Sequence, residues 1–305
     1  MNLKKLLFGF GVALVVAGQT LHAQPGAADG KQLADIRAQA EEGDAKSQCA
    51  LGEAFFGGKL GVAQDYAEAV KWFRKAAEQN DAKAQFDLGV CYYTGRGVAK
   101  DEAEAVKWYR KAAEQNSAKA QFQLGYCYAL GKGVTKDYAE AVKWYRKAAG
   151  QDYAKAQYRL GASYEFGRGV AKDEAEAVKW YRKAAGQNLV EAQVNLGYCY
   201  AFGEGVAEDD VEAVKWYRKA AEQNNAIAQA ALGDFFLDGK GVAKDKVEAY
   251  KWYLLAASQG NEVGKKHMTE LEDTISADQI AAGKRLANEW LEQHKKASAG
   301  NSAQP

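Results

Sequence analysis

The chain has 305 residues, of which 48% are hydrophobic and 27% charged, and its 41 basic residues nearly balance its 40 acidic ones. A chain this close to neutral lacks the positive excess that nucleic-acid phosphates reward, so we exclude nucleic acid as a partner. The only two prolines, Pro25 and Pro305, stand near the two ends, and Ala, Lys, Glu, Gln and Leu dominate between them. These residues favour helices, so the composition predicts an all-α fold.

The first 23 residues have the features of a secretory signal peptide. Lys4 and Lys5 precede an apolar run from Leu6 to Ala17, and the small residue Ala23 follows. The run is shorter than the ~20 apolar residues that span a bilayer, and no later run reaches that length. We therefore predict that residues 1–23 are a signal peptide cleaved after Ala23, that the protein is exported to the periplasm or secreted, and that it makes no stable membrane insertion.

A period of 36 residues runs through most of the chain. Self-similarity at a fixed period indicates a repeat array, and we predict six repeats over residues 44–260. The tryptophans that mark the period are Trp72, Trp108, Trp144, Trp180, Trp216 and Trp252.

Each repeat is predicted to be a helical hairpin. The second helix begins at an aspartate with a glutamate three residues later, as in Asp101 and Glu104, which is the spacing of a capping box. The first helix of that unit covers about 82–94 and ends at Gly95, which supplies the left-handed conformation that terminates helices. A lone hairpin could not bury both faces. We therefore predict that the hairpins stack into a right-handed α/α solenoid of about fifteen helices.

The segments outside the repeats are predicted to close the ends of the array. Residues 24–43 contain the N-terminal cap helix, in which Gln32–Glu42 resembles the second helix of a repeat. Residues 261–296 contain two helices, the second starting after Ser276 with Gln279 three residues on. Residues 297–305 are predicted to be a disordered tail.

The repeat unit resembles a known family. From Ser117 it reads SAKAQFQLGYCYALGKGVTKDYAEAVKWYRKAAGQ, with a Leu-Gly pair and a G-x-G-V-x-K-D loop. These motifs are similar to the Sel1-like repeat, a relative of the tetratricopeptide repeat, and the resemblance extends over all six copies. It implies a solenoid that serves as an adaptor in protein complexes, often in bacterial envelopes or secretion.

The cysteines depart from one branch of that family. A cysteine-rich branch, linked to penicillin binding and β-lactamase activity, pairs cysteines where this chain has Ala77 and Ala84. Packed helix axes lie ~8–10 Å apart, farther than the ~4.4–6.8 Å between the Cα atoms of a disulfide. We predict buried thiols, with bridges as the alternative that an exported setting permits. The four cysteines are Cys49, Cys91, Cys127 and Cys199.

The sequence predicts no catalytic, cofactor or metal site. His267 and His294 lie outside the repeats, lack a second ligand at zinc spacing, and are predicted to be solvated helix histidines. The G-x-G loops lack the strand and third glycine of a dinucleotide motif. No S-x-x-K, G-x-S-x-G or H-E-x-x-H motif occurs.

The copies differ on one side of the first helix. Positions equivalent to 84, 85, 88, 89, 91 and 92 hold nearly the same residues, whereas positions equivalent to 87, 90 and 94 change from copy to copy. A face that packs against the next repeat must keep its shape, so we predict that the variable positions line a concave groove that binds a protein or peptide. The candidate groove residues are Asp87, Val90, Thr94, Gln123, Tyr126, Leu130, Arg159, Phe166, Asn195, Tyr198 and Phe202.

Aromatic residues in this set would anchor a partner, and Asp87 and Arg159 would select its charge. The alternative is that position 94 packs the loop while positions 87 and 90 drift. A basic row follows the loop edge and either orients a partner or a second copy, or forms a solvated rim. The row consists of Arg96, Lys100, Lys132, Lys136, Arg168 and Lys172.

Together these features predict a non-catalytic scaffold in the cell envelope that binds a protein or peptide segment without a cofactor. A β-lactam-interacting enzyme, implied by the family resemblance, and a peptidoglycan- or glycan-binding module are the alternatives. Self-association into a homo-oligomer stays open.

Overall fold

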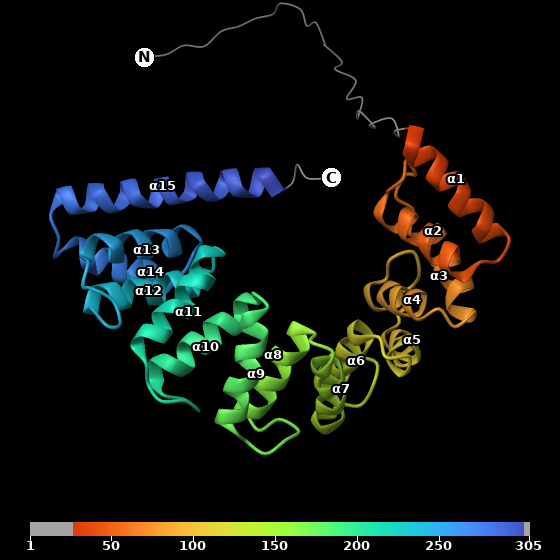
Figure 1. Cartoon of the computed structure of the whole chain (residues 1–305), viewed down its shortest axis with the longest axis horizontal. Helices are drawn as coiled ribbons and strands as arrows, with labels where there is room; N and C mark the ends of the chain where they lie inside the picture. Colours follow the sequence, from red (N-terminus) through yellow and green to blue (C-terminus); the bar gives the residue numbers. More distant parts are fainter. Residues whose placement is uncertain (1–26, 302–305) are drawn as a thin grey trace, which may run out of the picture.

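The computed structural model describes residues 27–301, with side chains in residues 29–294. The predicted signal peptide and residues 302–305 lie outside this range. Within it the chain forms fifteen α-helices arranged along an arc (Figure 1). They are α1 (Ala27–Glu41), α2 (Ala45–Gly57), α3 (Tyr66–Glu78), α4 (Ala82–Thr94), α5 (Glu102–Glu114), α6 (Ala118–Leu130), α7 (Tyr138–Gly150), α8 (Ala154–Glu165), α9 (Glu174–Gly186), α10 (Val190–Phe202), α11 (Asp210–Glu222), α12 (Ala226–Asp238), α13 (Lys246–Ser258), α14 (Glu262–Glu272) and α15 (Ala277–Asn301).

The six hairpins run from α2–α3 to α12–α13, and each helix packs against its neighbours in sequence. All six second helices begin at the predicted aspartates. In α5, for example, the Asp101 carboxylate accepts a hydrogen bond from the backbone N–H of Glu104 at 2.9 Å. The reciprocal half of a capping box does not form in this helix, because the Asp101 N–H donates to the Tyr92 carbonyl at 2.9 Å and the Glu104 side chain pairs with Lys107 at 2.8 Å. The aspartate alone therefore caps the helix.

The glycine-rich loop docks each hairpin onto the preceding one. Gly133 has φ +68° and lies against the backbone carbonyl of Glu102, at the start of the preceding second helix, where a Cβ atom would overlap the carbonyl oxygen. In the preceding loop Val98 packs against the core formed around Leu88. The loop motif is therefore part of the packing between repeats.

The repeated side of the first helices forms the core. In α6, Leu124 is fully buried, and Gly125 lies beside the ring of Tyr145 in α7, where an added Cβ would come within 2.8 Å of the ring. This close approach explains the Leu-Gly pair. The equivalent leucines are also fully buried: Leu51, Leu88, Leu160, Leu196 and Leu232.

A ladder of amide side chains joins successive repeats. Gln121 in α6 donates from Nε2 to the carbonyl oxygen of Ala113 and to Oδ1 of Asn116, both at 3.1 Å. Its Oε1 accepts from Nε2 of Gln151 at 2.8 Å. Because these amides are buried and partnered on both sides, they fix the spacing between hairpins. The other first-helix glutamines make related bonds: Gln48, Gln85, Gln157, Gln193 and Gln229.

Helices at both ends cover the terminal hairpins. At the N-terminal end, Leu33 and Ile36 of α1 pack against the core that contains Leu51 and Trp72. At the other end, α15 lies along α13 (Figure 1). There Trp290 meets Trp252 edge to face, with ring centroids 6.2 Å apart.

The last helix starts where predicted and ends later. The Ser276 N–H donates to the Gln279 side chain at 3.0 Å, and the Gln279 N–H donates to Ser276 Oγ at 3.2 Å, a complete capping box. The helix then continues to Asn301. Residues 297–301 are thus helical, where the sequence predicted a disordered tail, because alanines at 297 and 299 favour continuation of the helix.

All four cysteines are buried as free thiols. Burial raises the pKa of Cys91, Cys127 and Cys199 to about 12. The thiols therefore behave as small core side chains and are protonated at neutral pH.

Candidate functional site

The predicted groove residues lie on the accessible side of α4, α6, α8 and α10, with Phe166 directly after the end of α8. None of them is buried. Four expose large apolar side chains: Leu130 by 49%, Phe166 by 57%, Tyr198 by 42% and Phe202 by 64%. We call the eleven predicted residues together the variable face. Most line three hollows along the array, described in turn below.

The N-terminal hollow is lined by two carboxyl groups, one lysine and two phenylalanines. Asp87 and Val90 line a cavity of about 200 Å³ together with Glu53, Phe56 and Phe73. Oδ2 of Asp87 is buried and makes no hydrogen bond within the described chain. Burial, with a smaller contribution from the Glu53 carboxylate, raises the pKa of Asp87 to about 7. At neutral pH the protonated and ionised forms of this carboxyl group are therefore both populated.

The central hollow is aromatic and basic. Gln123, Tyr126 and Arg159 line a cavity of about 560 Å³. The guanidinium of Arg159 lies over the rings of Tyr126 and Tyr158, 5.9 and 5.8 Å from their centroids. Stacking of this kind holds the planar guanidinium while leaving its N–H edge available. The cavity is completed by Phe86, Tyr93, Lys119, Phe122, Tyr153, Lys155, Tyr158, Leu189 and Glu191.

The C-terminal hollow is aromatic and acidic. Phe202 lines a cavity of about 410 Å³ together with Tyr217 and Phe235. The Tyr198 ring packs on Phe202 with centroids 4.6 Å apart. Four carboxylates border the same cavity with one lysine: Glu208, Asp210, Asp234, Asp238 and Lys240.

Other members of the variable face make local contacts. Thr94 Oγ1 donates to the Val90 carbonyl of its own helix at 2.8 Å. The guanidinium of Arg168 lies 5.0 Å from the centroid of the Phe166 ring. Position 94 therefore contacts its own helix or loop in these two copies, as the alternative interpretation of that position expects, while the ring of Phe166 stays exposed.

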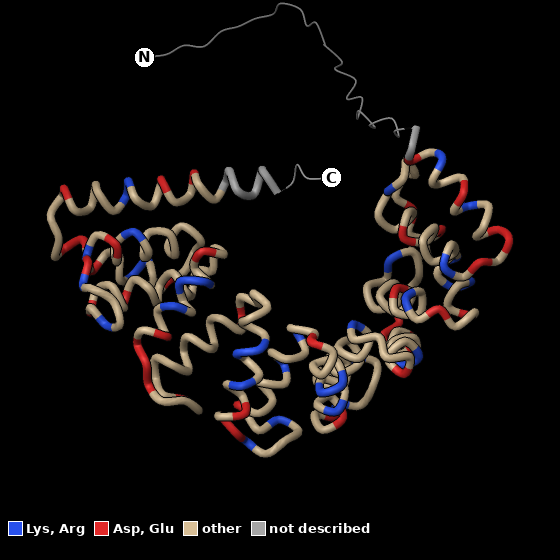
Figure 2. Tube along the Cα trace, viewed as in Figure 1, with Lys and Arg blue, Asp and Glu red and all other residues tan. Residues whose placement is uncertain are grey.

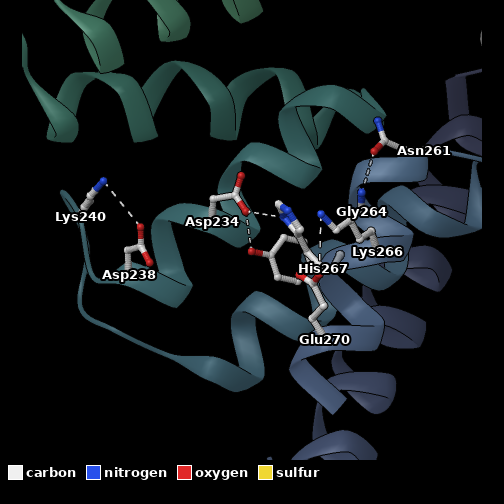
Figure 3. A network of polar contacts seen from close by, with 9 residues as sticks. Asp234, Asp238, Lys240, Asn261, Gly264, Lys266, His267 and Glu270 are labelled. Atoms are coloured by element: carbon white, nitrogen blue, oxygen red, sulfur yellow. Dashed lines mark hydrogen bonds and ion pairs between the residues drawn. The ribbon is translucent and has the colours of Figure 1, made fainter. Parts of the chain in front are cut away.

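A polar network beside the C-terminal hollow was missed by the sequence analysis (Figure 3). Asp234 Oδ1 accepts a hydrogen bond from the Tyr253 hydroxyl at 2.6 Å and lies 2.8 Å from Nδ1 of His267. Because Asp234 occupies the variable position 90 of the sixth copy, copy variation alone pointed to it. The contact with His267 of α14 lies outside the repeat register.

The prediction that both histidines are solvated is only partly correct, because each side chain is half-buried. His267 contacts Asp234 and stands edge to face against Tyr253, with centroids 5.4 Å apart. His294 stacks on Trp290 at 3.7 Å. The His267 contacts therefore join α14 to the sixth hairpin, whereas the His294 contact lies within α15. Across the described residues, no three histidine, cysteine or carboxylate side chains come together as metal ligands.

The basic row of the loop edge has local partners. Three of its members form ion pairs with glutamates and three stack on aromatic rings. These contacts with the repeats themselves favour the interpretation of the row as a solvated rim. The pairs are Lys100 and Lys132 with Glu102 and Lys172 with Glu174; the stacks are Arg96 on Tyr66, Lys136 on Tyr138 and Arg168 on Phe166. Beyond copy four the sign changes, and Figure 2 shows acidic residues gathered between α10 and α11.

The fold, the repeat length and the loop motif define a class of α/α solenoid built from helical hairpins. The chain belongs to the Sel1 repeat family, whose repeat matches residues 45–81, 82–117, 118–153, 154–189, 190–225 and 226–261. None of the helices in residues 27–301 combines the length and the apolar character needed to cross a membrane.

Two of the solved structures that are similar to this chain share about a third of its sequence. One is c5321, a protective antigen of uropathogenic Escherichia coli strains with an SLR fold, at 34% identity and a TM-score of 0.70. That match covers 84% of this chain and 64% of the antigen, so the chain spans less than two thirds of the antigen's length. The other is a Sel1 repeat protein from Oxalobacter formigenes, at 35% identity and a TM-score of 0.64, covering 76% of this chain and 97% of that one. Among curated proteins, none matches the chain significantly.

Proposed function

We propose that this Sel1 repeat protein is a non-catalytic scaffold that binds a protein or peptide segment along its variable face. The observation that carries the proposal is the exposure of Leu130, Phe166, Tyr198 and Phe202 on the variable side of three successive first helices. Exposing large aromatic side chains to water is unfavourable, and their exposed parts add no packing to the core. They suit the anchoring of a partner, because aromatic residues supply a large share of binding energy at protein interfaces.

The form of the array supports a binding role as well. The leucine, the glycine and the amide ladder fix the buried side of each first helix. The variable face on the other side therefore has a rigid backbone beneath it. A rigid surface loses little conformational entropy when a partner binds. The variable residues are therefore free to differ between copies without loss of the fold.

Site-specific photo-crosslinking tests the proposal. A photoreactive amino acid is placed at position 166, directly after α8, and at the exposed Glu114 of α5 as the matched control. We expect a discrete crosslinked protein from position 166 in extracts of the host cell, and none from position 114. Equal labelling at both positions, or none at either, would count against a binding face on the first helices.

We further propose that the scaffold acts outside the cytoplasm, on the strength of the predicted signal peptide in residues 1–23. Fractionation of cells that express the full chain tests this proposal. We expect a processed form that begins near Gln24 in the periplasm or the medium. Retention of the unprocessed chain in the cytoplasm would contradict it.

A further inference from the structure

The central hollow holds three cationic side chains that form no ion pair within 4 Å among the described residues. Lys83 in α4 pairs with Glu53 at 2.6 Å, but its equivalents Lys119 and Lys155 have no ion-pair partner among the described residues. The same holds for Arg159. All three line the central hollow, where Glu191 is the single acidic residue of the lining. An incoming carboxylate would meet the guanidinium edge of Arg159 and two lysines above an aromatic floor.

The C-terminal hollow has the opposite charge. Among the acidic residues around it, Glu208 and Asp210 have no ion-pair partner within residues 27–301, while Asp238 lies 3.6 Å from Lys240. The rings of Phe202 and Phe235 lie beside these carboxylates. A lysine or arginine side chain could pack its aliphatic part on the rings and place its charge among the acids.

The change from basic to acidic residues takes place along the series of first helices. At the position equivalent to 83, the lysines of α4, α6 and α8 give way to Glu191 in α10 and to the exposed Ile227 in α12. The equivalents of positions 90 and 94 become Asp234 and Asp238 in α12. Two sets of positions therefore change character between α8 and α12.

We propose that the variable face binds a protein segment of divided charge, with its acidic part over the central hollow and its basic part over the C-terminal hollow. This inference rests on the proposed function and specifies the partner and its orientation. Charge complementarity is the argument for the occupant, because opposite charges at the two hollows allow only one direction of binding for such a segment. A polyanion such as an acidic glycan would be repelled at the C-terminal hollow.

Synthetic peptides test the inference with the mature chain, residues 24–305. One labelled peptide carries an acidic half and a basic half around a central tyrosine, and a second has the same composition with alternating charges. Fluorescence anisotropy at low salt measures their affinities. We expect the divided peptide to bind at least about tenfold more tightly than the alternating one.

Charge-reversal variants locate the two contacts. We expect the double variant K155E/R159E to weaken the divided peptide about tenfold, and E208K/D238K to weaken it by a similar factor. The double variant K265E/K284E, which reverses two exposed lysines on α14 and α15, is the matched control and should stay within about twofold of the natural chain. A peptide whose acidic half is replaced by a second basic half should bind K155E/R159E better than it binds the natural chain. Circular dichroism verifies that every variant keeps its helical content.

Several results would overturn the inference. They are equal affinity for the two peptides, equal losses in the matched control, and tighter binding of an acidic polysaccharide than of the divided peptide. Absence of binding by either peptide would also overturn it. The photo-crosslinking at position 166 would still decide, independently, whether the face binds protein.

Discussion

The two sides of a single helix, α6, differ in burial and in how much they vary between copies. Gln121 and Leu124 are buried, and their equivalents recur in every copy. Gln123 and Leu130 lie on the other side, are accessible, and change from copy to copy. The comparison teaches that sameness between copies marks the contacts that stack the array, whereas difference marks the surface that the array presents.

The leucine pair in α6 gives the largest expected contrast. We expect Leu124→Ala to lower the free energy of unfolding by about 2–5 kcal/mol, because it opens a cavity between α6 and α7. Leu130→Ala removes a side chain that is 49% exposed and should cost less than about 0.5 kcal/mol. Chemical denaturation followed by circular dichroism measures both variants. Similar losses would mean that the two sides are not distinguished by packing.

Two glutamines of α6 allow the contribution of the amide ladder to stability to be compared with that of an accessible amide side chain. Gln121→Leu removes the hydrogen bonds to Ala113, Asn116 and Gln151, and we expect a loss of about 1–3 kcal/mol in the free energy of unfolding. Gln123→Leu removes none of these bonds and should change stability by less than about 0.5 kcal/mol. Denaturant melts of the two variants would be run side by side. If Gln121→Leu were as stable as the natural chain, the amide ladder would not stabilise the array.

A third, smaller effect concerns the one variable residue with a buried carboxyl oxygen. The pKa of Asp87 is about 7 in the folded chain, above its ordinary value of 3.8. Between these values the folded chain binds the proton more tightly than the unfolded chain, so this group's contribution to stability declines as pH rises from about 4 to about 7. We expect Asp87→Asn to be more stable than the natural chain by about 1–2 kcal/mol at about pH 8, and by less at about pH 5.

Denaturation of the natural chain and Asp87→Asn at several pH values measures the difference. Asp81→Asn is the control, since the Asp81 carboxylate caps α4 through a 2.7 Å hydrogen bond from the Ala84 N–H. That variant should show no gain of stability at high pH. A pH-independent difference between Asp87→Asn and the natural chain would show that Asp87 does not titrate as described.

Much of the fold could be predicted because the relevant signals lie within one repeat. The predicted range 82–94 matches α4, and the aspartates start the second helices, because caps and helix-ending glycines act through neighbouring residues. The amide ladder could not be predicted in the same way. Gln121 and Gln151 stand thirty residues apart, and only the stacking of two hairpins brings their side chains together.

The candidate site divides similarly. The helical period was sufficient to place Leu130, Phe166 and Phe202 on an accessible side. It could not show that Arg159 lies between two tyrosine rings from different helices, since Tyr126 belongs to the preceding repeat. Nor could it show the contact of Asp234 with His267, because α14 does not follow the repeat.

One variant tests the central claim most directly, namely that the variable side of the first helices binds the partner while the repeated side holds the array. The change is Tyr126, Phe166, Tyr198 and Phe202 to Ala in one chain, used beside the natural chain to capture the protein crosslinked at position 166. We predict unchanged helical content and loss of capture. Capture equal to that of the natural chain, with the helices intact, would contradict the claim.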